Sequence, residues 1–456
     1  MGEILDITDV AREATAEPAR VPVQAAGVQS ALLRDSLGYF GSKVVPGFMG
    51  LISVPVFIRI IGLDEYGRFA VIVPLLMAFA GASSGWLAQG ILRFHPGPGD
   101  SRARRVTFDQ AVRAGTIASV LVTCVVLAAV LREMHYQLVT LIISQVFCFA
   151  LLAYTVALAK FQAQLQPASV LRREIMRSAG GFVIPIALVL ITGRKHFAVM
   201  VLGQALAYTL AFLPGFRFRR GAGKLAADVP EKLRSDSPST REMIRKLWRF
   251  GWAVGLWLFL SQMFPVIDRW VIQKFASYTS AGVYASLYEI AIRSFSFLVF
   301  PITQAAHPRI MRSWNEGHSA ASYSIIRHSI FSQLAIFLAV LCGVSVFAHR
   351  ITRLILGFDD ATAARLLPVL VVGGFLWQLA LLLHKPLEIA ERTGAMLAGM
   401  TAVVGLNVIA CLLFIPRFGY EAAGYVLVFS ALSYIAFTLC TTRFRAFRKF
   451  SPVEDY

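Results

Sequence analysis

The chain has 456 residues, of which 57% are hydrophobic and only 15% are charged, and its mean hydropathy is +0.65. Soluble domains carry about 25% charged residues, so this composition excludes a soluble enzyme and indicates a membrane protein. The net charge of +18 and the pI near 10.1 fit a chain whose cytoplasmic loops are basic and face anionic lipid. No nucleic-acid partner is therefore expected.

The first segment, 1–36, opens with Glu3, Asp6 and Asp9 and mixes acidic, basic and small residues. It has neither the basic start nor the apolar core of a signal peptide, so it is predicted to be a disordered cytoplasmic tail. The five cysteines lie in apolar stretches with no CxxC pair and no histidine at a ligand spacing. Neither a disulfide framework, nor a metal site, nor a cofactor is expected.

Apolar runs near the length of about 20 residues that crosses a hydrocarbon core recur along the rest of the chain. The longest connection between them follows the sixth run and is strongly basic. We therefore expect an all-α polytopic membrane protein with an N-terminal six-helix bundle over 37–216, a basic linker over 217–247 and a C-terminal six-helix bundle over 248–441. A basic cytoplasmic tail follows over 442–456. The predicted spans are 37–60, 68–92, 111–131, 137–159, 176–193, 197–216, 248–272, 282–305, 327–348, 366–384, 395–416 and 420–441.

The orientation follows from the distribution of Lys and Arg among the connections. When the tail is placed inside, 31 of these residues fall on the inner face and 11 on the outer face. Positive loops stay in the cytoplasm, so both termini are predicted to be cytoplasmic. The end of the long connection, 239–250, is predicted to be an amphipathic helix on the inner leaflet.

A weak internal repeat links the two halves. The segment 64–70 (DEYGRFA) after the first span recurs as 279–285 (TSAGVYA) after the seventh. Each half has an even number of spans, so both halves enter the membrane in the same direction. An axis along the membrane normal would relate them, with a cavity between them.

Four motifs resemble the polysaccharide-transport or O-antigen flippases of the multidrug/oligosaccharidyl-lipid/polysaccharide (MOP) exporter superfamily, which includes the multidrug and toxin extrusion (MATE) transporters. They are 36–43 (SLGYFGSK), 56–69 (VFIRIIGLDEYGRF), 90–94 (GILRF) and 268–272 (DRWVI) followed by 281–284 (AGVY). The resemblance implies a V-shaped fold in the bacterial cytoplasmic membrane. Its motif residues include Gly67, Arg269, Gly282 and Tyr284.

The resemblance also implies an activity and partners. A flippase of this family moves undecaprenyl-diphosphate-linked oligosaccharide to the outer leaflet for O-antigen, capsule or exopolysaccharide synthesis, by alternating access and with an ion gradient of protons or sodium. The implied partners are the lipid-linked oligosaccharide, membrane lipids, a coupling ion, a polysaccharide polymerase and a chain-length regulator. The chain itself is expected to be a monomer.

Charges within the predicted spans are candidates for the cargo site, because a charge in the hydrocarbon region is costly unless it meets water or a partner. Lys43 and Arg293 are predicted to bind the diphosphate, since ammonium and guanidinium groups can replace lost water at phosphate oxygens. Arg93 and Arg59, near span ends, could serve the same head group or anchor the helices at the interfaces. Lys43 could instead snorkel to the inner surface.

Glu289 is the first candidate for ion coupling. It lies four residues before Arg293, which is the favourable helical order for an ion pair, so the two side chains could also simply neutralise each other. Asp268 is the rival for ion coupling, although its position beside Arg269 also suits a structural salt bridge.

Two other functions remain open at this stage. A MATE-type exporter of cations would need acidic groups in its cavity, whereas Lys43 and Arg293 outnumber Glu289 here. A membrane-embedded glycosyltransferase or polymerase would carry a large outer loop or a catalytic motif, and the sequence has short outer loops and no P-loop or HExxH motif. We therefore predict a transporter that is not an enzyme.

Overall fold

The structure is a computed structural model of the chain. It describes residues 45–97, 100–133, 136–164, 166–213, 239–299, 318–390 and 392–442, together with a few positions between 302 and 314. Over these residues it is built of helices and short connections, without strands. The predictions for the tail 1–36, for Lys43, for 217–238 and for 443–456 lie outside the described residues.

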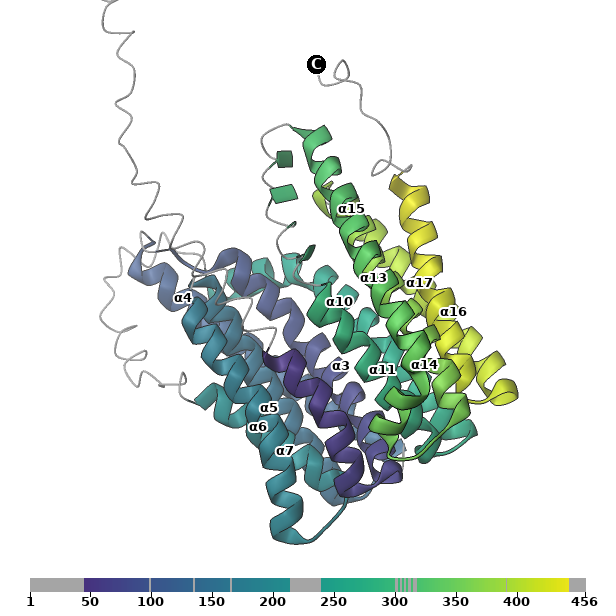
Figure 1. Cartoon of the computed structure of the whole chain (residues 1–456). Helices are drawn as coiled ribbons and strands as arrows, with labels where there is room; N and C mark the ends of the chain where they lie inside the picture. The colour runs from purple at the N-terminus through teal and green to yellow at the C-terminus, as the bar shows by residue number, and fades with distance from the viewer. Residues whose placement is uncertain are drawn as a thin grey trace, which may run out of the picture.

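Two helical bundles stand side by side in Figure 1. The N-terminal bundle comprises the helix Val45–Ile61, α3 (Leu63–Phe94), α4 (Arg102–Glu133), α5 (Leu138–Ala163), α6 (Pro167–Thr192) and α7 (Phe197–Phe212). The C-terminal bundle comprises α10 (Thr240–Phe275), α11 (Tyr278–Leu298), α13 (Ser319–Leu356), α14 (Ala361–Leu383), the short α15 (Lys385–Ile389), α16 (Thr393–Phe418) and α17 (Glu421–Thr442).

Nine of the described helices are long and apolar enough to cross a membrane, and Val45–Ile61 and Phe197–Phe212 are shorter apolar helices. With α11, which carries Glu289 and Arg293 within its 21 residues, they complete the six helices of each bundle. The predicted all-α architecture of two six-helix bundles is thereby confirmed.

The start of α10 differs from the expected linker. The Ser239 side chain accepts from the backbone N–H of Glu242, and the Glu242 carboxylate accepts from the backbone N–H of Ser239, so a capping box begins the helix there. The expected boundary between 247 and 248 therefore falls inside one continuous helix. Met243 and Leu247 pack with Trp86 of the N-terminal bundle, whereas Phe264 packs within the C-terminal bundle. As a result, α10 belongs to both bundles.

The fifth span also starts earlier than expected. Pro167 opens α6 at a position where its missing N–H costs nothing, whereas the apolar pattern indicated a start at 176. The helix ends at Gly193, whose φ of 66° is left-handed. Arg177, at the start of the span predicted from 176, therefore lies well inside a helix.

The bundles meet closely where α3 crosses α11. A Cβ on Gly67 would overlap the carbonyl group of Tyr278, and one on Gly282 would lie 2.6 Å from the carbonyl oxygen of Leu63. Only glycine allows backbones to approach so closely. Near this crossing, the Thr279 hydroxyl donates to Asp64 at 3.4 Å. The two repeated segments thus pack against each other.

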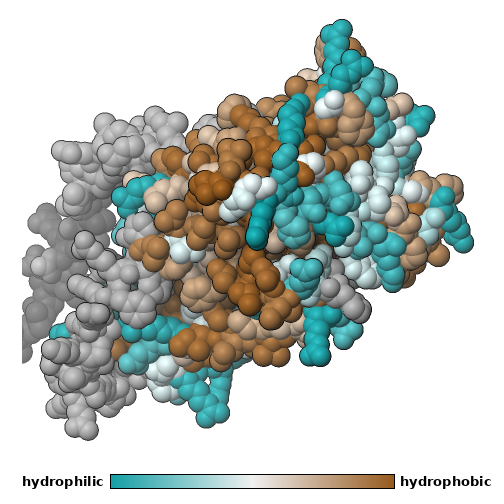
Figure 2. Space-filling model, turned by 90° about the horizontal axis from the view of Figure 1, so that it is seen from below, coloured by the Kyte–Doolittle hydropathy of each residue, from teal (hydrophilic) through white to brown (hydrophobic). Residues whose placement is uncertain are grey.

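Apolar side chains cover much of the outer surface of the described helices. Figure 2 shows large hydrophobic areas with separate hydrophilic patches, and residues such as Val125, Leu190, Ile191 and Val346 are at least 70% exposed. Such a surface would be unstable in water but suits contact with lipid acyl chains.

The predicted orientation can be checked with single cysteines at two exposed positions, Arg245 in the first turns of α10 and Asp359 between α13 and α14. The exposed Cys342 and Cys440 would first be replaced by serine. A membrane-impermeant maleimide added to intact cells should label Asp359→Cys, and should label Arg245→Cys only after the membrane is opened. Labelling of both positions in intact cells would contradict the orientation.

Candidate functional site

A cavity of about 380 Å³ lies between the two bundles. The helix Val45–Ile61, α3, α5, α6 and α7 line it on one side, and α10, α11 and α14 on the other. The wall combines apolar side chains with polar ones such as Ser53, Gln204 and Gln262. Its described charged lining residues are three arginines and one glutamate, namely Arg177, Arg269, Arg293 and Glu289.

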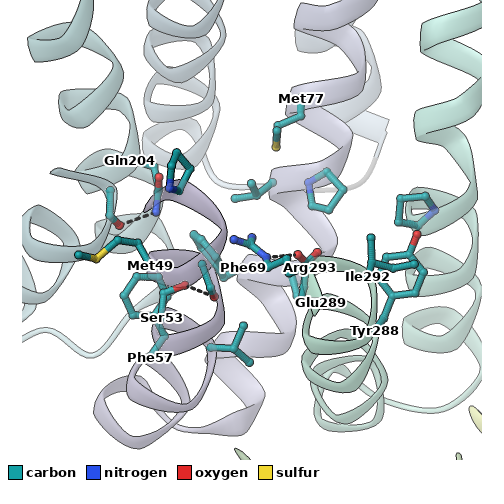
Figure 3. Close-up of a pocket in the computed structure, with 18 of the residues that line it drawn as sticks. Met49, Ser53, Phe57, Phe69, Met77, Gln204, Tyr288, Glu289, Ile292 and Arg293 are labelled. Atoms are coloured by element: carbon teal, nitrogen blue, oxygen red, sulfur yellow. Dashed lines mark hydrogen bonds and ion pairs between the residues drawn. The ribbon is translucent and has the colours of Figure 1, made fainter. Parts of the chain in front are cut away.

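Glu289 is held between two guanidinium groups. Arg269 Nη2 donates to its Oε1 at 2.7 Å, and Arg293 Nε donates to its Oε2 at 2.8 Å. The side chain of Arg269 is 2% exposed, that of Glu289 24% and that of Arg293 39%. The exposed fraction therefore rises along the relay from Arg269 through Glu289 to Arg293, and Figure 3 shows Arg293 extending from Glu289 across the cavity.

Arg269 also connects the bundles. It starts on α10, and its Nη1 donates to the backbone carbonyl of Ala70 on α3 at 3.1 Å. Its guanidinium lies 5.2 Å from the ring centroid of Tyr288, which adds a cation–π contact. Both Nη groups of Arg269 are therefore engaged and its side chain is buried, so Arg293 is the more accessible of the two arginines that bind Glu289.

Arg177 on α6 is a further positively charged residue of the cavity wall, on the side of the N-terminal bundle. Its Nε and Nη2 donate to Glu174 Oε2 at 3.1 and 2.9 Å, and its guanidinium lies 5.8 Å from the ring centroid of Tyr208. Sequence reasoning missed this residue because Arg177, at the start of the span predicted from 176, was counted among the basic residues of the inner connection. The i,i+3 spacing of Glu174 and Arg177 after the helix-opening Pro167 was the signal that could have found it.

Arg59 and Arg93 are not among the described residues that line the cavity. Arg59 Nη2 donates to the carbonyl of Leu354 on α13 at 2.6 Å, which ties the first helix to the other bundle. Arg93, in the last turn of α3, lies 5.8 Å from the ring centroid of Phe250. Both side chains are exposed.

Asp268 lies inside the C-terminal bundle and is completely buried. Its Oδ2 accepts from the Tyr284 hydroxyl at 2.7 Å and its Oδ1 from the Cys411 thiol at 3.2 Å. Arg269 points to Glu289 instead of forming the salt bridge that was considered for Asp268. The reason is geometric, because consecutive residues of a helix do not face each other.

Two six-helix bundles with a cavity between them form the fold that solved transporters of the MOP superfamily share, a class of polytopic membrane proteins. The family model of the polysaccharide biosynthesis proteins matches residues 32–314, which is more than half of the chain. The chain therefore belongs to the polysaccharide biosynthesis protein family, as the sequence motifs indicated.

Solved structures are similar over most of their length. The lipid II flippase MurJ in an inward closed conformation aligns with a TM-score of 0.66 and 11% identity, over 93% of this chain and 89% of that chain. An inward-facing multidrug resistance MATE family transporter aligns at 0.63 and 14% identity, over 88% and 94%. A MOP superfamily transporter from Pyrococcus furiosus aligns at 0.58 and 15%, over 91% and 95%. At these identities the likeness shows the fold. No curated protein sequence matches the chain.

Substitution of Glu289 is expected to lower the stability of the protein more than substitution of Arg269. Glu289→Gln removes the counter-charge of two arginines, of which Arg269 is buried, and should destabilise the protein by about 3 kcal/mol. Arg269→Met leaves Glu289 paired with Arg293 and should cost less. Thermal unfolding in detergent measures both, and the double variant should be more stable than Glu289→Gln alone. The reverse order of the two single variants would show that Glu289 does not hold the relay together.

Proposed function

We propose that the protein is a flippase that moves undecaprenyl-diphosphate-linked oligosaccharide across the bacterial cytoplasmic membrane by alternating access, for the synthesis of a polysaccharide such as O-antigen, capsule or exopolysaccharide. The observation that carries this proposal is the positive charge of the cavity between the bundles. Three arginines and one glutamate line its described wall. Membership of the polysaccharide biosynthesis protein family supports the same cargo.

The physical requirement is the transfer of a hydrated, doubly charged head group through hydrocarbon. Diphosphate oxygens that lose their water need replacement donors, and a guanidinium supplies two in one plane. Glu289 holds the Nε of Arg293 and Nη1 lies against Gly50, so Nη2 is the group that can face the cargo. Arg177 faces the same cavity from the opposite bundle and serves as a second contact. Lys43 remains a proposed third contact.

A MATE-type exporter is the alternative function, because the fold is shared with MATE transporters. An exporter of cationic compounds would need carboxylates to attract its cargo. In the described cavity, the one lining carboxylate is already engaged by two arginines. The charge of the site therefore favours an anionic cargo.

The diphosphate proposal predicts that Arg293→Ala and Arg177→Ala lower translocation of lipid-diphosphate oligosaccharide in proteoliposomes. The loss should be about tenfold or more for Arg293→Ala, because a charge-assisted contact to phosphate is removed. Arg417→Ala is the matched control, since Arg417 is an exposed residue in the last turn of α16 outside the described cavity lining. Normal translocation by Arg293→Ala would remove this residue from the site.

Asp268 is the residue that we propose for ion coupling, with Glu289 as the rival. A coupling carboxylate must exchange its ion during transport, and Glu289 has two guanidinium partners that compete with any ion for its oxygens. Asp268 has neutral partners, Tyr284 and Cys411, and makes no ion pair within the described structure. It also precedes Arg269 directly on α10, so a change at Asp268 can move the relay.

Ion coupling is tested by imposing a pH gradient, or separately a sodium gradient, on proteoliposomes. The gradient that stimulates the parent protein should have no effect on Asp268→Asn, although translocation without a gradient persists. Cys411→Ser is the matched control, because a hydroxyl can still donate to Asp268. If Glu289→Gln loses the stimulation and Asp268→Asn keeps it, the coupling role belongs to Glu289.

A further inference from the structure

The guanidinium of Arg293 rests directly on the backbone of another helix. Gly50 lies in the helix Val45–Ile61 of the N-terminal bundle. A Cβ added to Gly50 would overlap Nη1 of Arg293, and would lie 2.7 Å from its Cζ and 3.1 Å from its Cδ. The missing side chain of Gly50 therefore forms a notch that the guanidinium occupies.

The contact is built from several sides. Met49 and Ser53 flank Gly50 on the cavity wall, and the Ser53 hydroxyl donates to the Gly50 carbonyl at 2.8 Å. From its own bundle, Arg293 is fixed by Glu289. Figure 3 shows its guanidinium between Glu289 and the helix that carries Met49 and Ser53. Glu289 and the notch thus hold the side chain from opposite sides of the cavity.

A glycine inside a helix has a cost, because it destabilises the helix by about 0.5–1 kcal/mol relative to alanine. Gly81 in α3 and Gly343 in α13 also lie inside helices, but no other atom lies within 4 Å of the position that a Cβ would take there. Gly50 differs from them, since its space is filled by a charged group from the other bundle. A requirement for this space accounts for glycine at position 50.

We infer that Gly50 is a positioning residue that seats Arg293 for the cargo's diphosphate. The inference rests on the proposed function, because Arg293 is the cation that meets the phosphate there. The C-terminal bundle supplies the cation and its partner Glu289, and Gly50 of the N-terminal bundle provides the space for the guanidinium. A larger residue at position 50 removes the seat without changing any charge in the cavity.

The seating of Arg293 can be measured without cargo. Phenylglyoxal modifies accessible guanidinium groups, and mass spectrometry of the digested protein reports the rate at Arg293. Overfilling a packed site shifts the balance against the seated side chain by about tenfold, so Gly50→Ala should increase the rate at Arg293. Gly81→Ala is the matched control and should leave it unchanged. An unchanged rate at Arg293 in folded Gly50→Ala would overturn the inference.

Farnesyl diphosphate serves as the probe for the cargo head group, with farnesol as its uncharged counterpart. Gly50→Ala should weaken binding of the diphosphate by about tenfold and leave farnesol binding unchanged. In the Arg293→Lys background, whose ammonium is narrower than a guanidinium, Gly50→Ala should cause little further loss. An equal loss in both backgrounds would show that Gly50 acts on its own helix and not through Arg293.

Two further outcomes separate this inference from the proposed function. If Gly50→Ala melts at a lower temperature, the Arg293→Lys background should restore stability by removing the overlap, and failure to restore it counts against the notch. If phenylglyoxal reactivity rises as expected while the parent protein does not bind farnesyl diphosphate, Gly50 still positions Arg293. In that case the proposed diphosphate cargo is wrong.

Discussion

The pairing of Glu289 with Arg269 and Arg293 determines how this protein can keep charge inside a membrane. Each ion within the hydrocarbon region costs several kcal/mol unless it has a partner or water. The carboxylate of Glu289 forms ion pairs with both guanidinium groups. The cluster therefore keeps a net positive charge while its buried residue, Arg269, has an anionic partner. The cavity can therefore be cationic without an isolated buried arginine at this point.

The same cluster joins the two bundles at separate points. Arg269 reaches the carbonyl of Ala70 on α3, and Arg293 lies against Gly50 on the first helix. Both arginines belong to the other half of the chain. α10 adds a third connection, because its first turns pack on the N-terminal bundle and its later turns on the C-terminal bundle. The charged cluster and α10 thus both bridge the two bundles, so the proposed alternating access would change the contacts of both.

The sequence was sufficient for the architecture because apolar length and charge distribution are local properties. It also indicated the pair of Glu289 and Arg293, since their spacing places them on one helical face. The partner of Arg269 could not be deduced in this way, because Glu289 lies on a different helix. The same holds for Asp268, whose bond from Cys411 joins residues 143 positions apart.

Arg177 illustrates a different limit. Hydropathy places the start of a span where the chain becomes apolar, whereas α6 begins earlier at Pro167. A helix that continues past the apolar run carries its charged residues with it, and the pattern cannot tell whether they face water outside or a cavity inside. The role of Gly50 could not be predicted from the sequence either. It depends on the side chain of Arg293, which belongs to a distant helix.

The glycine crossing of α3 and α11 has the form of a dimer contact. Gly67 meets Tyr278 and Gly282 meets Leu63, and each equivalent pair is separated by the same 215 positions that separate Asp64 from Thr279. Contacts in which residue i meets j and j meets i are the mark of an isologous, two-fold interface. A single six-helix half carrying this surface could pair with a copy of itself in parallel orientation. The fused chain then has a freedom that such a homodimer lacks: its halves can diverge, so that Arg293 and its seat at Gly50 need to occur only once.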